Sequence, residues 1–222
     1  MSKYHSVFEI IGPVMIGPSS SHTAGAVRIG QIAAKVYGGL AQKAKITFYG
    51  SFAHTYKGHG TDVAIIAGIL GMETYDSRIP YAYREAEKSN LEIEIEENFD
   101  PVQFPNTAKV ELSGSLDSTS IIGVSVGGGT IQILKINGFE CHITGENPAV
   151  LVFHYDVKGR IAAVTNVIAE NEINVSHLEV SRQEKGKIAL MIFQTDEPMP
   201  DEVLNKLRSI HEITRVVQVK TE

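Results

Sequence analysis

The chain has 222 residues, 43% of them hydrophobic, with 20 Lys and Arg against 26 Asp and Glu and one cysteine. This length and apolar content suit one large or two small domains. The net charge of −6 without a basic run argues against nucleic-acid binding. No apolar stretch approaches the ~20 residues that span a membrane. The N-terminus has no signal-peptide pattern, and one cysteine forms neither an internal disulfide nor a thiolate metal site, so we expect a cytoplasmic protein.

Residues 1–146 are predicted to mix helices and strands, and they hold 18 of the 20 glycines. Apolar residues at helical spacing predict helices over 24–37 and 62–70. Strands are predicted over 45–49, 91–96 and 109–112, and over 119–126 and 130–136, which flank a triple glycine. Alternation in 91–96 (LEIEIE) indicates one acidic, solvated face. The glycines between the last two strands are typical of a hairpin rather than of a dinucleotide-binding turn.

Residues 148–222 show a more regular pattern. Strands are predicted over 149–155, 173–181, 188–194 and 213–219, and helices over 160–171 and 200–210. The order β-α-β-β-α-β is the split βαβ of ferredoxin-like folds. One face of such a sheet is left open, so we expect pairing with a second copy or another domain. The turn-rich segment 137–148 separates the halves, giving an α/β (α+β) protein with a mixed-sheet domain at 1–146 and a ferredoxin-like domain at 148–222.

A cluster of hydroxyls precedes the first predicted helix. It contains Ser19, Ser20, Ser21, His22 and Thr23. Side-chain oxygens and free backbone N–H groups at a helix N-terminus favour a carboxylate or phosphate ligand. The alternative is an ordinary loop with a Ser or Thr N-cap, but a cap needs only one such residue.

A second polar loop, Gly58-His59-Gly60-Thr61-Asp62, lies at the start of the next predicted helix. Thr61 or Asp62 can cap that helix, and the flanking glycines leave His59 exposed, as a general base requires. The alternative is a glycine-rich turn with an incidental surface histidine. We interpret 49–54 as the end of the preceding strand, so that Ser51 and His54 could line the same crevice.

The remaining polar features are weaker candidates. Asn106 and Thr107 lie in a loop that could contribute an amide and a hydroxyl, although most such loops are plain turns. Cys141 is typical of a small buried residue. A hydrolase triad is disfavoured, because the serine-histidine loop has no strand-elbow serine and no matched acidic partner.

Several runs resemble a known family. SVFEIIGPVMIGPSSSHTAGAVRIG, YGSFAHTYKGHGTDVAIIAGILG, FPNT and SVGGGTIQI resemble the beta part of bacterial iron–sulfur-dependent L-serine dehydratases over nearly all of residues 1–146. Residues 148–222 resemble an ACT domain, a small regulatory module of amino-acid enzymes, through the turn 156–160 and the strand start 173–175. The resemblance implies a first domain similar to the allosteric substrate-binding domain of some phosphoglycerate dehydrogenases.

The dehydratase resemblance implies conversion of L-serine to pyruvate and ammonia by β-elimination. The family uses a four-iron four-sulfur (4Fe-4S) cluster held by cysteines of an alpha domain, fused to the beta part or separate from it. With one cysteine, this chain fits the two-chain type, with a separate alpha subunit as partner and no metal ligands of its own. The implied substrate-binding residues are Ser19, Ser20, Ser21, Thr23, Thr61 and Asp62, with Asn106 and Thr107 as lesser contributors. His59 is the first candidate for the base that takes the α-proton, and His22 is its rival.

The ACT resemblance implies self-association through 148–222 and a possible amino-acid effector near Asp156, Gly159 and Asn174. Because the phosphoglycerate dehydrogenase domain is a sensor, a non-catalytic amino-acid- or anion-sensing module is the competing hypothesis. An exposed histidine in GHGTD favours the catalytic hypothesis, since a sensor needs no base. A third possibility, a scaffold with a dimerising ACT half, leaves the serine-rich loop unexplained.

Overall fold

The computed structural model describes residues 13–219, which form two compact units divided between Asn137 and Gly138. The division falls at the start of the turn-rich segment 137–148 that the sequence singles out; the domain limits 1–146 and 148–222 themselves remain a prediction. Within the described residues, no helix has both the length and the apolar character that crossing a bilayer demands.

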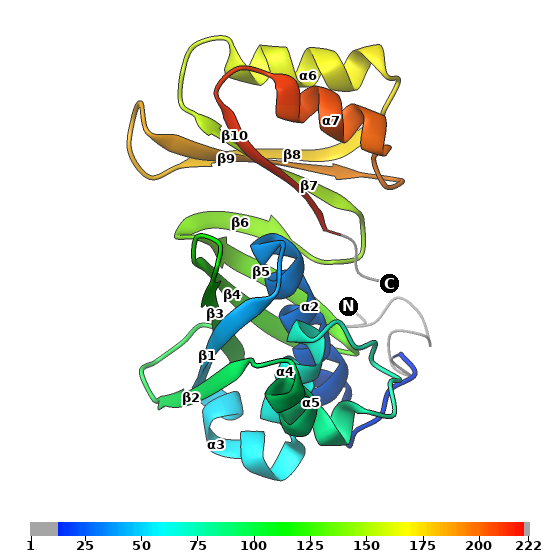
Figure 1. Cartoon of the computed structure of the whole chain (residues 1–222), viewed down its shortest axis with the longest axis vertical. Helices are drawn as coiled ribbons and strands as arrows, with labels where there is room; N and C mark the ends of the chain where they lie inside the picture. The colour runs from blue at the N-terminus through cyan, green and yellow to red at the C-terminus, as the bar shows by residue number, and fades with distance from the viewer. Residues whose placement is uncertain (1–12, 220–222) are drawn as a thin grey trace, which may run out of the picture. The chain divides into compact units, whose positions relative to one another are not determined.

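The first unit contains a mixed sheet and several helices (Figure 1). Its elements are η1 (Ser20–Ala24), α2 (Gly25–Tyr37), β1 (Ala41–Tyr49), α3 (Gly50–His59), α4 (Thr61–Ile69), η2 (Ile79–Tyr81), α5 (Ala82–Lys88), β2 (Glu92–Asn98), β3 (Asn106–Gly114), β4 (Thr119–Gly127) and β5 (Thr130–Ile136). The strands are hydrogen-bonded in the order β2-β1-β3-β4-β5. The β1–β2 pair is parallel and the other pairs are antiparallel, which confirms the mixed sheet.

Helices α2 and α4 approach each other closely because small residues face each other at their contact. A Cβ atom at Gly30 would overlap the backbone carbonyl of Ile65, and one at Gly68 would overlap that of Val27. The helices are therefore in backbone contact, and both bury apolar side chains, such as Ile29 and Ile66. This contact places the serine-rich turn, at the N-terminal end of α2, against α4.

The segment after β1 differs from the sequence prediction. Residues 50–54 do not end the strand but begin α3, which runs to His59. Its sequence, GSFAHTYKGH, has two glycines and no apolar stripe, so local propensity does not favour a helix. Tertiary hydrogen bonds hold its first turn, because the carbonyl of Pro105 accepts from the backbone N–H of Ser51 at 2.6 Å and of Phe52 at 3.4 Å.

The other predicted elements of this unit are present, with longer strands. β1 and β3 extend beyond the predicted 45–49 and 109–112, and the predicted hairpin is the antiparallel pair of β4 and β5. The predicted side-chain cap of α4 is wrong: Gly60 is its N-cap and makes no side-chain cap bond. Thr61 and Asp62 are the first helical residues instead.

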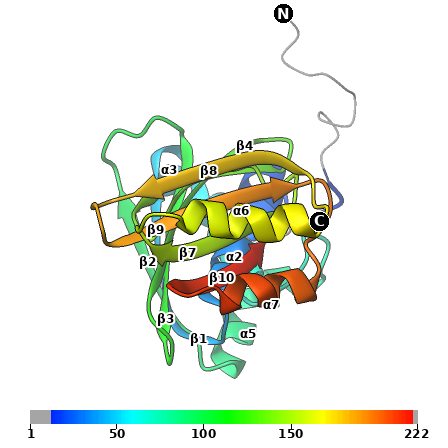
Figure 2. The ribbon, with the colours of Figure 1, turned by 90° about the horizontal axis from the view of Figure 1, so that it is seen from above.

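The second unit is ferredoxin-like, as predicted. Its elements are β6 (Phe139–Ile143), β7 (Ala149–Tyr155), α6 (Arg160–Glu170), β8 (Val175–Arg182), β9 (Ile188–Thr195), α7 (Asp201–Ser209) and β10 (Ile213–Val219). The antiparallel strand order is β10-β7-β9-β8. Helices α6 and α7 lie side by side on one face (Figures 1 and 2). They bury Val164 and Leu207 against Val152 and Phe193 of the sheet.

The opposite face of this sheet, which we expected to pair with a second copy or another domain, is covered. Leu151, Leu190 and Ile192 on that face are buried. Strand β6, which the sequence does not predict, lies against it, with the rings of Phe139 and Phe153 6.3 Å apart.

Candidate functional site

The serine-rich turn is a widened helical turn that leads directly into α2. Ser19 is its N-cap, with extended backbone, and its Oγ accepts a hydrogen bond from the backbone N–H of His22 at 3.4 Å. The backbone N–H of Thr23 donates to the Ser19 carbonyl at 2.8 Å. One serine therefore caps the helix, and the turn carries His22 and Thr23 into the interior of the unit.

His22 is held by hydrogen bonds at both ring nitrogens. Its Nδ1 lies 3.1 Å from Ser21 Oγ and 3.5 Å from Ser19 Oγ, and its Nε2 lies 3.1 Å from Thr55 Oγ1 of α3. The side chain is only 9% exposed. Burial, and secondarily the neighbouring His59, lower the pKa of His22 below its usual 6.5, so the imidazole is neutral at pH 7.

His59 is exposed and lies against His22. The two ring centroids are 4.6 Å apart with the planes at 63°. His59 is the last residue of α3, and Gly60, with φ +65°, turns the chain into α4. A Cβ at Gly58 or at Gly60 would meet no other atom within 4 Å, so the flanking backbone leaves the ring accessible, as predicted. The two candidate histidines thus form one site.

The start of α4 contributes two further candidate residues. Thr61 is fully buried, and its hydroxyl finds no hydrogen-bond partner within residues 13–219. Asp62 accepts a hydrogen bond from the hydroxyl of Tyr83 on α5 at 2.9 Å. Burial, followed by this carboxylate, raises the pKa of Tyr83, so the phenol stays protonated. The bond of Asp62 runs to α5, whereas we expected this carboxylate to orient His59 or bind substrate.

The prediction that Asn106 and Thr107 lie in a loop is wrong: they are the first two residues of β3, where that strand meets α3. Asn106 is bridged to Gly50, and its Nδ2 donates to the Ser125 carbonyl at 3.4 Å. The Thr107 hydroxyl donates to Phe104 O at 2.7 Å. These bonds stabilise the loop that receives the first turn of α3, a structural role that a plain turn would also have.

Gly50 is required at this junction. Its φ is +54°, and a Cβ there would lie 2.6 Å from the Pro105 carbonyl oxygen. A larger residue would therefore be strained by its backbone and would also separate the loop from α3. The glycine keeps α3, and with it Thr55 and His59, beside the serine-rich turn.

Sequence reasoning missed Thr55 because it missed α3. Ser51, Thr55 and His59 follow one another at intervals of four, so a helix places them on one face. That spacing is the signal that could have found Thr55. His54 does not join this face: its exposed ring lies 5.0 Å from that of Phe99. The His54 ring therefore does not line a crevice together with Ser51, contrary to our expectation.

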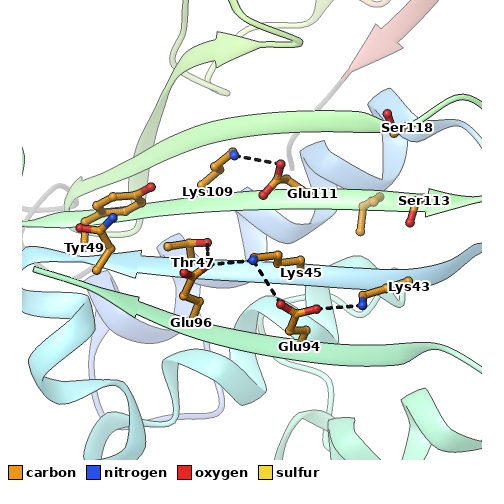
Figure 3. Close-up of a pocket in the computed structure, with 12 residues that line it drawn as sticks. Lys43, Lys45, Thr47, Tyr49, Glu94, Glu96, Lys109, Glu111, Ser113 and Ser118 are labelled. Carbon is orange, nitrogen blue, oxygen red and sulfur yellow. Dashed lines mark hydrogen bonds and ion pairs between the residues drawn. The ribbon is translucent and has the colours of Figure 1, made fainter. Parts of the chain in front are cut away.

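A second polar hollow, of about 570 Å³, lies over the outer face of β2, β1 and β3 (Figure 3). Lys45 bridges Glu94 at 3.1 Å and Glu96 at 2.9 Å, Lys43 bonds Glu94 at 2.8 Å, and on β3 Lys109 bonds Glu111 at 2.8 Å. These pairs lower the pKa of both Glu94 and Glu96. Cations and carboxylates here neutralise each other, consistent with the solvated acidic face predicted for β2.

The described part of the chain does not fit an iron–sulfur cluster. Within it, no group of three or more His, Cys, Asp or Glu side chains could hold a metal ion. Cys141 is buried in β6, and burial, with a smaller effect of Glu179, raises the pKa of its thiol to about 12. A cluster ligand must be a thiolate, which this environment disfavours.

The effector candidates of the second unit lie at opposite ends of its sheet. Asp156 accepts from Arg182 at 2.8 Å and from the backbone N–H of Gly186 at 3.1 Å, at the β8–β9 turn. Asn174 donates to Asp196 at 2.9 Å, beside a hollow of about 340 Å³ at the other end of β9. Gly159, with φ +83°, is the N-cap of α6. One copy of the chain does not bring the three together.

Comparison with known proteins identifies both units. The family model described as serine dehydratase beta chain matches residues 6–115, and the ACT domain model matches 149–212. A probable L-serine dehydratase beta chain of Bacillus subtilis (strain 168) is 49% identical over 98% of this chain and 99% of its own. The L-serine dehydratase beta chain of Peptoniphilus asaccharolyticus is 33% identical over 97% and 98%. A D-3-phosphoglycerate dehydrogenase of Synechocystis is 21% identical over 86% of this chain and 35% of its own.

Proposed function

This chain belongs to the family of L-serine dehydratase beta chains, and we propose that it is one subunit of a two-chain L-serine ammonia-lyase that forms pyruvate and ammonia from L-serine. Two beta chains match it over nearly their whole length. The observation that carries the proposal is the contact between an exposed His59 and a buried His22 beside serine hydroxyls. β-Elimination needs a base at the α-carbon, and the exposed histidine supplies one.

His59 is our candidate for the base that takes the α-proton. It is exposed at the open side of the cluster, and its neighbour His22 is committed at both nitrogens to Ser21 and Thr55. A ring so engaged has no free nitrogen for a substrate proton, which makes His22 the weaker candidate. Loss of the α-proton and of the β-hydroxyl leaves an enamine, which water hydrolyses to pyruvate and ammonia.

We assign substrate binding to the polar groups around this pair. Ser19, Ser20, Ser21 and Thr23 come from the serine-rich turn, and Thr61 and Asp62 come from the start of α4. The buried hydroxyls of Thr23 and Thr61 have no hydrogen-bond partner among residues 13–219, which supports this assignment, because such groups are costly unless a ligand or water satisfies them. Asn106 and Thr107 are assigned a supporting place beside α3.

The 4Fe-4S cluster that the family resemblance implies is assigned to a separate alpha subunit. The mismatch between this chain's single buried cysteine and the ligand set of a cluster supports that division. We further propose the cytoplasm as the compartment, since cysteine-ligated clusters and free thiols suit a reducing environment.

The decisive experiment is anaerobic pyruvate formation from L-serine. The chain is assayed alone and then with the candidate alpha subunit after reconstitution with iron and sulfide. Activity in the mixture alone supports a shared enzyme. An inactive mixture that forms a complex with an intact cluster overturns the proposal. It favours the sensing module instead, to which the partial match to a phosphoglycerate dehydrogenase corresponds. Calorimetric titration of the chain with L-serine then becomes the next test.

We also propose that the second unit self-associates through the edge strand β8. That strand ends the sheet order, and its Leu178 and Val180 are each 41% exposed. Antiparallel pairing of two such edges brings Asn174 of one copy towards Arg182 of the other, the residue that holds Asp156. The effector positions that one copy separates would thereby meet across the dimer axis.

Sedimentation equilibrium tests this pairing. A double substitution, Leu178→Glu with Val180→Glu, is expected to shift the full chain towards the monomer. Leu40→Glu in the first unit, at a site 89% exposed, is the matched control and leaves association unchanged. Equal association of the chain and both variants would contradict the assignment of β8.

A further inference from the structure

Thr55 has one hydroxyl proton, and the structure shows where it goes. Its Oγ1 lies 2.7 Å from the carbonyl oxygen of Ser51, one turn earlier in α3, and a carbonyl oxygen can only accept. The same Oγ1 lies 3.1 Å from His22 Nε2. With its proton donated to Ser51, Thr55 can only accept from the imidazole. The neutral ring of His22 therefore carries its proton on Nε2.

This tautomer determines the direction of the bonds on the other side of the ring. Nδ1 is then a bare lone pair, so Ser21 Oγ, at 3.1 Å, donates to it. Because the Ser21 proton is committed there, the bond of 3.2 Å between Ser21 Oγ and Ser19 Oγ has Ser19 as donor. A single chain of hydrogen bonds, all in one direction, runs from Ser19 through Ser21, His22 and Thr55 to the carbonyl of Ser51.

We propose that Thr55 is a positioning residue that sets the direction of this chain and so presents the oxygens of Ser19 and Ser21 to the substrate as acceptors for its ammonium group. The inference rests on the proposed function and refines it. Hydroxyls whose protons point inward offer lone pairs only. An ammonium group has three N–H donors, whereas a carboxylate only accepts, so the serine pair suits the amino end of L-serine.

The surroundings of His22 keep the hydrogen bonds in this direction. Desolvation of His22 disfavours the imidazolium, which would donate at both nitrogens and reverse the bond to Ser21. Phe52 lies against the ring, with centroids 5.1 Å apart, and helps to exclude water. The remaining ring contact is His59, at the open side. The direction of the chain therefore depends on the Thr55 hydroxyl.

Nitrogen NMR of the full chain, labelled with ¹⁵N in the histidine rings, tests the tautomer at pH 7.5. Two-bond ¹H–¹⁵N correlations, assigned with a His22→Gln variant, are expected to show His22 with protonated Nε2 and bare Nδ1. In Thr55→Val, a near-isosteric change, the acceptor is gone and the ring shifts towards the Nδ1-protonated form. Thr55→Ser restores a hydroxyl and the original pattern. Protonated Nδ1 in the unchanged chain, or an unaltered pattern in Thr55→Val, would overturn the proposal.

Kinetics of the reconstituted two-chain enzyme test the substrate end. Loss of an oriented acceptor for a charged group is expected to raise the KM for L-serine about ten-fold or more in Thr55→Val, with a smaller change in kcat, and by less than about three-fold in Thr55→Ser. Equal KM values in all three would overturn the ammonium role. If even the unchanged enzyme is inactive, the proposed function fails, while the NMR comparison still decides whether Thr55 directs the chain.

Discussion

Two polar regions of the first unit differ in how their polar groups are satisfied. On the outer face of β2, β1 and β3, lysines and glutamates meet in exposed pairs that cancel one another's charge. Around His22, whose imidazole is buried and neutral, the hydroxyls are partly buried and are joined to the ring by hydrogen bonds that run in one direction. In the first arrangement, each cation is paired with a carboxylate. The second leaves the Ser19 and Ser21 oxygens as acceptors, beside an exposed histidine.

This contrast separates a solvated surface from a reactive one. The charged hollow has a volume of about 570 Å³, yet water screens its ion pairs and they offer little energy. Hydrogen bonds among buried groups act in a medium of lower effective dielectric, so each one constrains its neighbours more strongly. The direction and burial of polar groups, rather than their number, mark the candidate site.

Removing His59 is the strongest test of this contrast. His59→Ala in the reconstituted enzyme is expected to lower turnover by ~10²–10⁴-fold, the usual cost of losing a general base. Lys45→Met on the charged face is expected to leave turnover within about three-fold, because its ion pairs contact no part of the His22 cluster. Anaerobic pyruvate formation measures both. A His59→Ala enzyme as active as the Lys45 variant would rule out His59 as the base and shift that assignment to His22.

A substitution at the junction that brings α3 to the site is expected to have a smaller effect, measured as a loss of stability. Gly50→Ala places a Cβ 2.6 Å from Pro105 O at a φ of +54°, and we expect a loss of ~1–3 kcal/mol in the free energy of unfolding. Gly58→Ala, later in α3 with open space around it, is expected to be neutral or stabilising by up to ~1 kcal/mol.

Urea unfolding of the full chain compares the two alanine variants of α3. Similar midpoints for both would show that the Pro105 contact does not constrain the junction.

The ion pairs of the charged face give the smallest expected effect, with a definite pH dependence. Pairing with Lys43 and Lys45 lowers the pKa of Glu94 below its ordinary 4.5, and Lys45 does the same for Glu96. Their stabilisation is therefore fully present above pH 4.5 and is lost as the pH falls through the lowered values. We expect Lys45→Met to be slightly less stable than the unchanged chain at pH 7 and equal to it in strong acid.

Thermal unfolding across pH measures this small difference, with Lys185→Met in the β8–β9 turn as the control. The control variant is expected to show no such dependence, because Lys185 takes part in none of the ion pairs found among residues 13–219. A Lys45→Met difference that persists in acid would show that the side chain acts through packing of its stem rather than through charge.

The sequence predictions are most accurate where apolar residues follow a clear helical or strand spacing. In the second unit, the apolar residues of 149–155 and 213–219 and the amphipathic helices predict β7, β10, α6 and α7 within one residue at every end. In the first unit, α3 escaped prediction because GSFAHTYKGH has no apolar stripe at helical spacing. Its first turn depends on the carbonyl of Pro105, more than fifty residues away.

The residue types available to the site follow from the sequence alone: a serine-rich turn before one helix, an accessible histidine before the next and a single cysteine. Those are properties of local composition and spacing. Tertiary packing was needed to bring His22 against His59, to join Thr55 to His22 and to bond Asp62 to Tyr83. Each of these contacts joins segments distant in the chain, and packing rather than local preference sets such distances.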